Sequence, residues 1–88
     1  MYELWLRENV KKEFEKLKHK DKRRLEVIDK KIQQILQDPY KFKPLRAPMQ
    51  NFRRVHVNKS FVLIYTIDEI SKRVYIERYD HHDNVYVS

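Results

Sequence analysis

The sequence contains no glycine and no cysteine among its 88 residues. A chain without cysteine cannot form disulfides, use a thiol nucleophile or bind zinc through thiolates. A chain without glycine cannot build the glycine-rich phosphate loops of nucleotide-binding proteins or the nucleophile elbow of serine hydrolases, because those backbones require glycine. Nucleotide-cofactor enzymes and serine hydrolases are therefore poor candidates.

Long apolar runs are missing too. No run approaches the roughly 18 residues of a membrane span, and the segment from Met1 to Arg7 lacks the layout of a signal peptide. We expect a cytoplasmic protein with no membrane partner. The length predicts a single domain over residues 1–88, close to the smallest size that builds its own core, so a partner that extends this core would stabilise it.

Positive charge is what the chain has in excess. Its 20 Lys and Arg residues outnumber its 13 Asp and Glu residues, which gives a net charge of +7. Residues 1–46 hold 14 basic and 8 acidic side chains, whereas residues 47–88 hold 6 and 5. Hydrophobic residues make up 41% of the chain, which is enough for a folded core. A basic globular domain favours a polyanionic partner, either nucleic acid or an acidic protein.

Hydrophobic periodicity predicts six elements. They are a strand near residues 2–7, a helix around 10–17, a second helix over 22–37, and strands over 52–57, 61–67 and 72–79. The run Lys18-His19-Lys20-Asp21 is expected to break the first helix, with Asp21 as a possible cap of the second, and Asp38-Pro39 to end the second. Asn58 is expected to take a positive φ in its turn, since no glycine is present.

This element order predicts an α+β fold, β-α-α-β-β-β, in which a mainly antiparallel sheet packs on a helical hairpin. The first strand should join the sheet at an edge or beside a C-terminal strand. Phe42 and Leu45 are expected to tuck under the loop after the second helix, and residues 80–88 to form a polar tail.

Candidate chemical groups gather in two places. One is the face of the 52–57 strand that carries Arg54 and His56, and the other is the C-terminal run from Arg78 to Tyr86, which contains His81 and His82. Consecutive hairpins would bring the two regions together across the sheet. Guanidinium, imidazole and phenol groups suit the cleavage of RNA phosphodiesters, which needs a base, an acid and cations that stabilise the charged transition state. No metal or cofactor is required.

Each of these groups also has an ordinary interpretation. Arginine and histidine on a strand are usually exposed surface residues, and Tyr86 could simply pack. A metal site at His81-His82-Asp83 is disfavoured, because adjacent residues of an extended chain point to opposite faces. The basic stripe of the helical half is either a solvated face or a surface for a polyanion. Its members are Lys11, Lys12, Lys16, Lys18, Lys20, Lys22, Arg23 and Arg24.

Together these features resemble the RelE/ParE superfamily of toxins from type II toxin–antitoxin systems. The likeness covers nearly the whole chain and rests on the element order, Leu45-Arg46 before the strand FRRVHV, the strand FVLIYTI, and the ending His-His-Asp-Asn-Val-Tyr. The chain looks most similar to the RelE branch, including its archaeal-type members. That resemblance implies a ribosome-dependent mRNA endoribonuclease that attacks with the 2′-hydroxyl and leaves a 2′,3′-cyclic phosphate. It also implies a RelB-type antitoxin as partner.

The resemblance also assigns residues. Catalysis would fall to Arg54, His56, Arg78, His81, His82 and Tyr86. Binding of RNA or ribosome would fall to Arg46, Arg53, Lys59, Lys11, Lys18, Lys20, Lys22 and Arg23. Two positions depart from the family pattern: Val62 stands where an arginine usually contacts phosphate, so that Lys59 or Arg78 would have to compensate, and Asp80 replaces a usual glycine.

Two other functions stay open on the same fold. A ParE-like toxin would inhibit DNA gyrase, although ParE toxins generally lack the acid and base groups of the tail. A module that binds nucleic acid without catalysis would use only the charge of the helical half.

Overall fold

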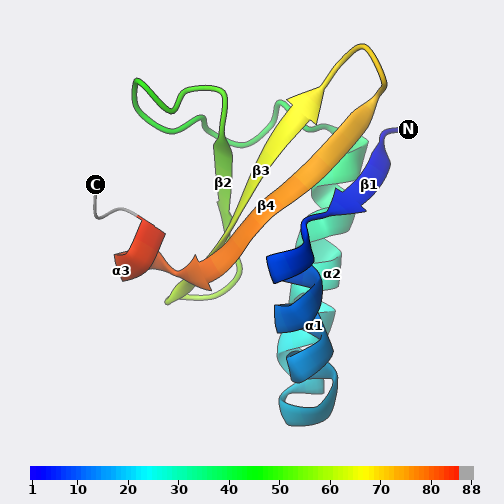
Figure 1. Ribbon diagram of the computed structural model, residues 1–88, viewed down its shortest axis with the longest axis vertical. Helices are drawn as coiled ribbons and strands as arrows, with labels where there is room; N and C mark the ends of the chain where they lie inside the picture. The colour runs from blue at the N-terminus through cyan, green and yellow to red at the C-terminus, as the bar shows by residue number, and fades with distance from the viewer. Residues whose placement is uncertain (86–88) are drawn as a thin grey trace.

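A computed structural model describes residues 1–85 of the protein. Its elements are β1 (Glu3–Leu6), α1 (Glu8–Lys20), α2 (Lys22–Gln37), β2 (Arg53–His56), β3 (Phe61–Asp68), β4 (Arg73–His81) and α3 (His82–Val85). The sheet order is β1-β4-β3-β2, with β1 parallel to β4 and the other pairs antiparallel. Two long helices lie side by side as one layer and the sheet forms the other (Figure 1). The predicted α+β class, the element order and the edge position of the first strand are confirmed.

The two long helices meet at Asp21. The Oδ1 atom of Asp21 accepts a hydrogen bond from the backbone N–H of Arg24 at 3.1 Å, which caps α2 as predicted. The predicted break at residues 18–20 is wrong, because α1 continues to Lys20. Basic side chains in the last turn of a helix interact favourably with its C-terminal partial charge, so this run extends α1 rather than ending it.

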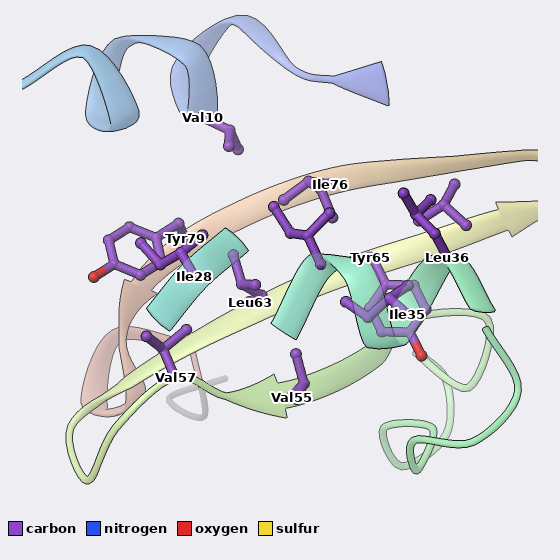
Figure 2. Close-up of a cluster of buried hydrophobic side chains, with 12 residues drawn as sticks. Val10, Ile28, Ile35, Leu36, Val55, Val57, Leu63, Tyr65, Ile76 and Tyr79 are labelled. Carbon is purple, nitrogen blue, oxygen red and sulfur yellow. The ribbon is translucent and has the colours of Figure 1, made fainter. Parts of the chain in front are cut away.

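The main core lies between the helical hairpin and one face of the sheet (Figure 2). Helix α2 contributes Ile28, Ile32, Ile35 and Leu36, and α1 contributes Val10. The strands contribute Val55, Leu63, Tyr65, Val74, Ile76 and Tyr79, with Val57 following β2. Strand β3 is buried on both faces, as its uninterrupted apolar run predicts. Within residues 1–85, no helix combines the length and the apolar character needed to cross a bilayer.

Tyr65 anchors this core to the end of α2. Its hydroxyl donates a hydrogen bond of 2.6 Å to the Pro39 carbonyl, and burial raises the pKa of Tyr65 to about 12. We expect Tyr65→Phe to lower the free energy of unfolding by about 1–3 kcal/mol, because the Pro39 carbonyl would lose its partner in a buried place. Urea titration measures this loss. The matched control is Tyr40→Phe at a half-exposed position, for which we expect a smaller change; an equal loss in both variants would contradict the prediction.

The other face of the sheet, called here the open face, carries a smaller apolar cluster. Leu45 packs there on Val62 and Ile64, with Phe52 and Val85 beside them. Leu45 is therefore covered as expected, whereas Phe42 packs against the main core.

One turn prediction is wrong. Among residues 1–85, the residue with a positive φ is Lys72, at 57°, and not Asn58. The Asn58 side chain instead accepts the backbone N–H groups of Ser60 and Phe61, at 2.8 and 3.1 Å, which closes the turn without a left-handed residue.

The C-terminal strand is longer than predicted. Asp80 and His81 belong to β4, because they pair with Val62 and Phe61 of β3. The predicted polar tail from residue 80 is therefore wrong over the described residues, and His82 begins the short helix α3 instead.

Glu69 ties three distant segments together at the β3–β4 turn. Its carboxylate accepts hydrogen bonds from Lys72, from Tyr40 at 2.5 Å and from Tyr2 at 2.8 Å. These donors, with Lys72 the strongest, lower the pKa of Glu69 from its ordinary 4.5 to about 2. The cluster holds the N-terminus and the loop after α2 against the hairpin.

Acid should therefore weaken the fold through Glu69. Because the pKa of Glu69 is lower in the folded state, its stabilisation of the fold is present above pH 4.5 and is lost as the pH falls toward 2. We expect Glu69→Gln to be less stable than the wild type at pH 7 and to show a smaller further loss between these two pH values. Urea unfolding across this window measures the difference, with Glu26→Gln on the exposed side of α2 as the control. A parallel pH dependence of Glu69→Gln and wild type would refute the role of this carboxylate.

Candidate functional site on the open face

The strand register brings the predicted cations of β2 and β4 onto the same face. Arg54 pairs with Ile64, and Ile64 pairs with Arg78. These three residues form one row across the open face, so the Cα atoms of the two arginines lie about 10 Å apart across a single intervening strand. The row supports the expectation that hairpin topology brings Arg54 and Arg78 together.

The neighbouring row holds His56, Val62 and Asp80. Val62 is fully buried in the middle of this row. The place of the phosphate-contacting arginine expected from the family is therefore filled by an apolar side chain, with His56 beside it in the row and Arg78 in the next row. A shallow hollow of about 290 Å³ at the outer edge of β2 is lined by Lys31, Phe42, Lys43, Arg54, Val55 and His56.

Asp80 holds Arg78 and the start of α3. The Nη2 atom of Arg78 donates to Oδ2 of Asp80 at 3.1 Å and to the Asn84 carbonyl at 3.4 Å. Asn84 donates from Nδ2 to Oδ1 of Asp80 at 3.0 Å, and this bond is the first cause of the lowered pKa of Asp80. Asp80 thus positions Arg78 while it offsets part of its charge. Sequence reasoning noticed Asp80 only as a departure from a family pattern.

The two tail histidines lie together where β4 gives way to α3. Their ring centroids are 4.7 Å apart, so the prediction that they point to opposite faces is wrong. The reason is that His82 is already helical, and the alternation of an extended chain stops at His81. Asp83 completes the cluster, with Oδ1 at 2.9 Å from Nδ1 of His82 and Oδ2 at 3.5 Å from Nδ1 of His81.

The contacts of Asp83 distinguish the two imidazoles. Its backbone N–H donates to Nδ1 of His81 at 3.2 Å, and its carboxylate faces Nδ1 of His82 at 2.9 Å. In both rings Nε2 is therefore the nitrogen left to face a substrate. Asp83 was not predicted as a site residue, although the string His-His-Asp was the signal that could have indicated it.

The α1–α2 turn reaches this cluster through Phe61. The Arg24 guanidinium lies 4.5 Å from the centroid of the Phe61 ring, and that ring meets His81 edge-on at 5.5 Å. The backbone N–H of His82 also donates to the Ser60 carbonyl at 2.8 Å, which places Lys59 of the β2–β3 turn next to the cluster. One end of the molecule therefore collects basic residues from both layers around the histidines.

The other predicted binding residues are dispersed. Lys11, Lys18, Lys20, Lys22 and Arg23 belong to the helical layer, where Lys11 and Lys18 pair with glutamates on their own helix. Arg46 follows Leu45 in the loop that packs on the open face. Arg53 lies on the other side of β2 from Arg54 and donates to the Phe42 carbonyl at 2.6 Å, so it fastens the loop after α2. Tyr86 lies outside the described residues.

Comparisons with known proteins agree with this fold. A model of the ParE toxin of type II toxin–antitoxin systems, parDE, matches residues 5–86. A protein of Methanocaldococcus jannaschii named "Putative toxin RelE4" is 45% identical over 86 residues, which is 98% of this chain and 92% of that one. An uncharacterised protein of Methanosarcina mazei is 48% identical, over 98% of this chain and all of that one.

Solved structures show the same architecture. The YoeB/ParE toxin from Agrobacterium tumefaciens superposes with a TM-score of 0.82 at 18% identity, over 91% of this chain and 98% of that one. The toxin–antitoxin complex RelBE2 from Mycobacterium tuberculosis contains a chain with a TM-score of 0.73 at 24% identity, over 91% of this chain and 96% of that one. The fold together with these matches defines a small toxin of the α+β type. The chain belongs to the RelE/ParE superfamily of type II toxin–antitoxin toxins.

Proposed function

We propose that this toxin is a ribosome-dependent mRNA endoribonuclease that uses no metal in its chemistry. The observation that supports it best is the row Arg54–Ile64–Arg78, which places one arginine on either side of one strand, with His56 in the next row. The His81–His82 pair lies at the end of β4, where His81 contacts Phe61 on the helix-facing side of the sheet. A scissile phosphate over this row would meet a cation from each side.

The reaction needs one proton removed and one delivered. His82 takes the proton of the 2′-hydroxyl, and the resulting oxygen attacks the adjacent phosphorus. Negative charge then builds on the non-bridging oxygens, where Arg54 and Arg78 stabilise it. The bond from phosphorus to the 5′-oxygen breaks, His81 supplies the proton to that oxygen, and the products are a 2′,3′-cyclic phosphate and a 5′-hydroxyl. His56 and Tyr86 stay predicted participants that orient the substrate or share the proton transfer.

Cleavage of translating mRNA tests this function. The purified protein is added to a translation extract, and primer extension maps new 5′ ends in the message. We expect cuts that appear only while the message is on ribosomes and are absent with the same RNA alone. An intact message under translation would overturn the proposal.

A second candidate is inhibition of DNA gyrase, because the matching family model is described as a ParE toxin. A supercoiling assay with purified gyrase separates the two. Loss of supercoiling together with an intact message would assign the chain to the gyrase inhibitors. A chain inactive in both assays that still retains RNA on a filter would be the non-catalytic binding module.

The proposed partner is an acidic antitoxin of the RelB type, and the helical layer offers it a surface. A groove of about 880 Å³ runs between α1, α2 and β1. Its apolar lining includes Leu4, Leu6, Phe14, Leu25, Ile28 and Ile32. The charged residues that line it are three lysines, Lys18, Lys22 and Lys30, and two acids, Glu26 and Asp29, so its rim is basic in balance. An amphipathic segment with acidic edges would match both the lining and the charge.

The charge of this groove is testable with a matched pair of lysines. Lys22 lines the groove and Lys16 does not, although both are exposed on the helical layer. With the product of the adjacent reading frame as antitoxin, we expect Lys22→Glu to weaken the complex about tenfold at low salt, mainly by slowing association, and Lys16→Glu to change it little. Equal effects of both variants would place the antitoxin elsewhere.

A further inference from the structure

The cluster of His81, His82 and Asp83 has the geometry of a metal site. Each of the three residues offers one potential ligand atom, and these atoms all lie within 4.8 Å of one another. We propose that the cluster binds one divalent transition-metal ion of the Zn²⁺ type. The site lies where β4 ends and α3 begins.

Two of the ligand pairs already lie near coordination distance, and a bound ion would replace the Asp83 N–H at Nδ1 of His81. Ligand atoms that bind one tetrahedral Zn²⁺ at its usual bond lengths lie about 3.3 Å from each other. The Asp83 oxygens lie 2.9 Å from Nδ1 of His82 and 3.5 Å from Nδ1 of His81, on either side of that value. The side chains of His81 and His82 are 38% and 37% exposed, so their rings have room to rotate by the small amount that closes the set around an ion.

The backbone holds the three ligands in place. The N–H of His82 is fixed to the Ser60 carbonyl at 2.8 Å, and the N–H of His81 donates to Oδ1 of Asp80 at 2.7 Å. Asn84 donates to the same Asp80 carboxylate at 3.0 Å, which closes the first turn of α3. A site pre-formed in this way loses little freedom on binding, unlike a pair of histidines on a flexible tail.

The donor set selects the class of ion. Two imidazoles and one carboxylate suit Zn²⁺, Ni²⁺, Co²⁺ or Cu²⁺, whereas Mg²⁺ and Ca²⁺ prefer oxygen ligands. Three protein ligands leave one tetrahedral position for water. The negative charge of Asp83 lowers the cost of placing a dication beside the basic residues at this end of the molecule.

The bound ion would silence the nuclease, and this consequence rests on the proposed function. Coordination through Nδ1 places the remaining proton of His82 on Nε2, so His82 could no longer accept the proton of the 2′-hydroxyl. The metal-free protein is then the active form and the metal-loaded protein the inactive one. Binding and inhibition are separate measurements, so a failure of the nuclease proposal leaves the metal site testable.

Calorimetric titration of the full-length protein with ZnCl₂ at neutral pH tests the site. We expect one ion per chain with micromolar affinity, at least tenfold weaker binding in His82→Gln and in Asp83→Asn, and unchanged binding in His19→Gln, a histidine at the far end of α1. Circular dichroism confirms that each variant is folded. No saturable binding below millimolar Zn²⁺, or equal affinity of His82→Gln and wild type, would overturn the proposal.

Cleavage assays test the consequence. We expect one equivalent of Zn²⁺ to abolish mRNA cleavage, EDTA to restore it, and Asp83→Asn to need at least tenfold more Zn²⁺ for the same inhibition. Stoichiometric binding without any loss of cleavage would refute the inhibitory role and leave the binding site standing. An inactive protein that still binds Zn²⁺ through His82 would refute the nuclease proposal alone.

Discussion

Replacing Arg54 by alanine should slow cleavage of translating mRNA by about 10²–10³-fold, the usual cost of losing one preorganised donor to a charged transition state. Arg54 lies in the row with Arg78, and the two residues flank Ile64 on the open face. Because the guanidinium charge matters most when charge builds on phosphorus, the loss should appear in the rate of the chemical step more than in binding. Single-turnover cleavage on programmed ribosomes measures it.

The matched control is Arg73→Ala. Arg73 also lies on β4, at the opposite end of the strand, where its guanidinium stacks on Trp5 at 4.6 Å. We expect this variant to cleave at nearly the wild-type rate. Arg54→Lys should retain part of the activity, because a lysine keeps the charge but not the fork of donors. If Arg54→Ala cuts as fast as Arg73→Ala, the reactive phosphate does not bind over this row.

Local signals made some of the fold readable from sequence. Both ends of helix α2 were predicted correctly. Asp21 caps its start by accepting the backbone N–H of Arg24, and Asp38-Pro39 ends it because the residue before a proline disfavours helical backbone angles. The end of α1 was missed because Lys18, His19 and Lys20 look like a polar interruption but form a normal last turn. Charge alone does not end a helix.

Strand pairing between distant residues determines features of the fold that local sequence signals do not show. Strand β4 reaches His81 only because β3 begins at Phe61 and offers partners to both Asp80 and His81. Nothing in the alternation of residues 72–79 shows that extension. Lys72 adopts the left-handed conformation at the β3–β4 turn, where its ammonium binds Glu69, a contact that no sequence pattern announced.

The sequence likewise predicted part of the candidate site. The convergence of Arg54 and Arg78 follows from hairpin topology, which is why sequence reasoning anticipated it. The contact between His81 and His82 arises because the strand ends at His81 and the helix begins at His82. Hydrophobic periodicity cannot locate such a boundary to a single residue. Arg53 was predicted to bind RNA, but its guanidinium donates hydrogen bonds to carbonyls of the loop after α2.

The two tail histidines should differ in the bond-making step that each serves. We expect His82→Ala to lower the cleavage rate by about 10²–10⁴-fold, the range for loss of a positioned general base. His81→Ala should lower the rate because the acid that protonates the leaving 5′-oxygen is gone. A message with sulfur in place of that 5′-oxygen separates the two roles, because a thiolate leaves without a proton. Sulfur substitution should restore much of the rate of His81→Ala and little of the rate of His82→Ala.

The assignment depends on the contacts of Asp83, so a third variant provides the control. Asp83→Asn keeps a side chain of the same shape and the backbone N–H that donates to His81, but removes the carboxylate that faces Nδ1 of His82. We expect its rate to fall less than that of His82→Ala, and sulfur substitution to leave that loss unrestored. Single-turnover rates with the oxygen and sulfur messages on the same programmed ribosomes measure all three variants. If sulfur substitution restores His81→Ala and His82→Ala equally, the two imidazoles share one role, and the acid must be sought among His56 and Tyr86.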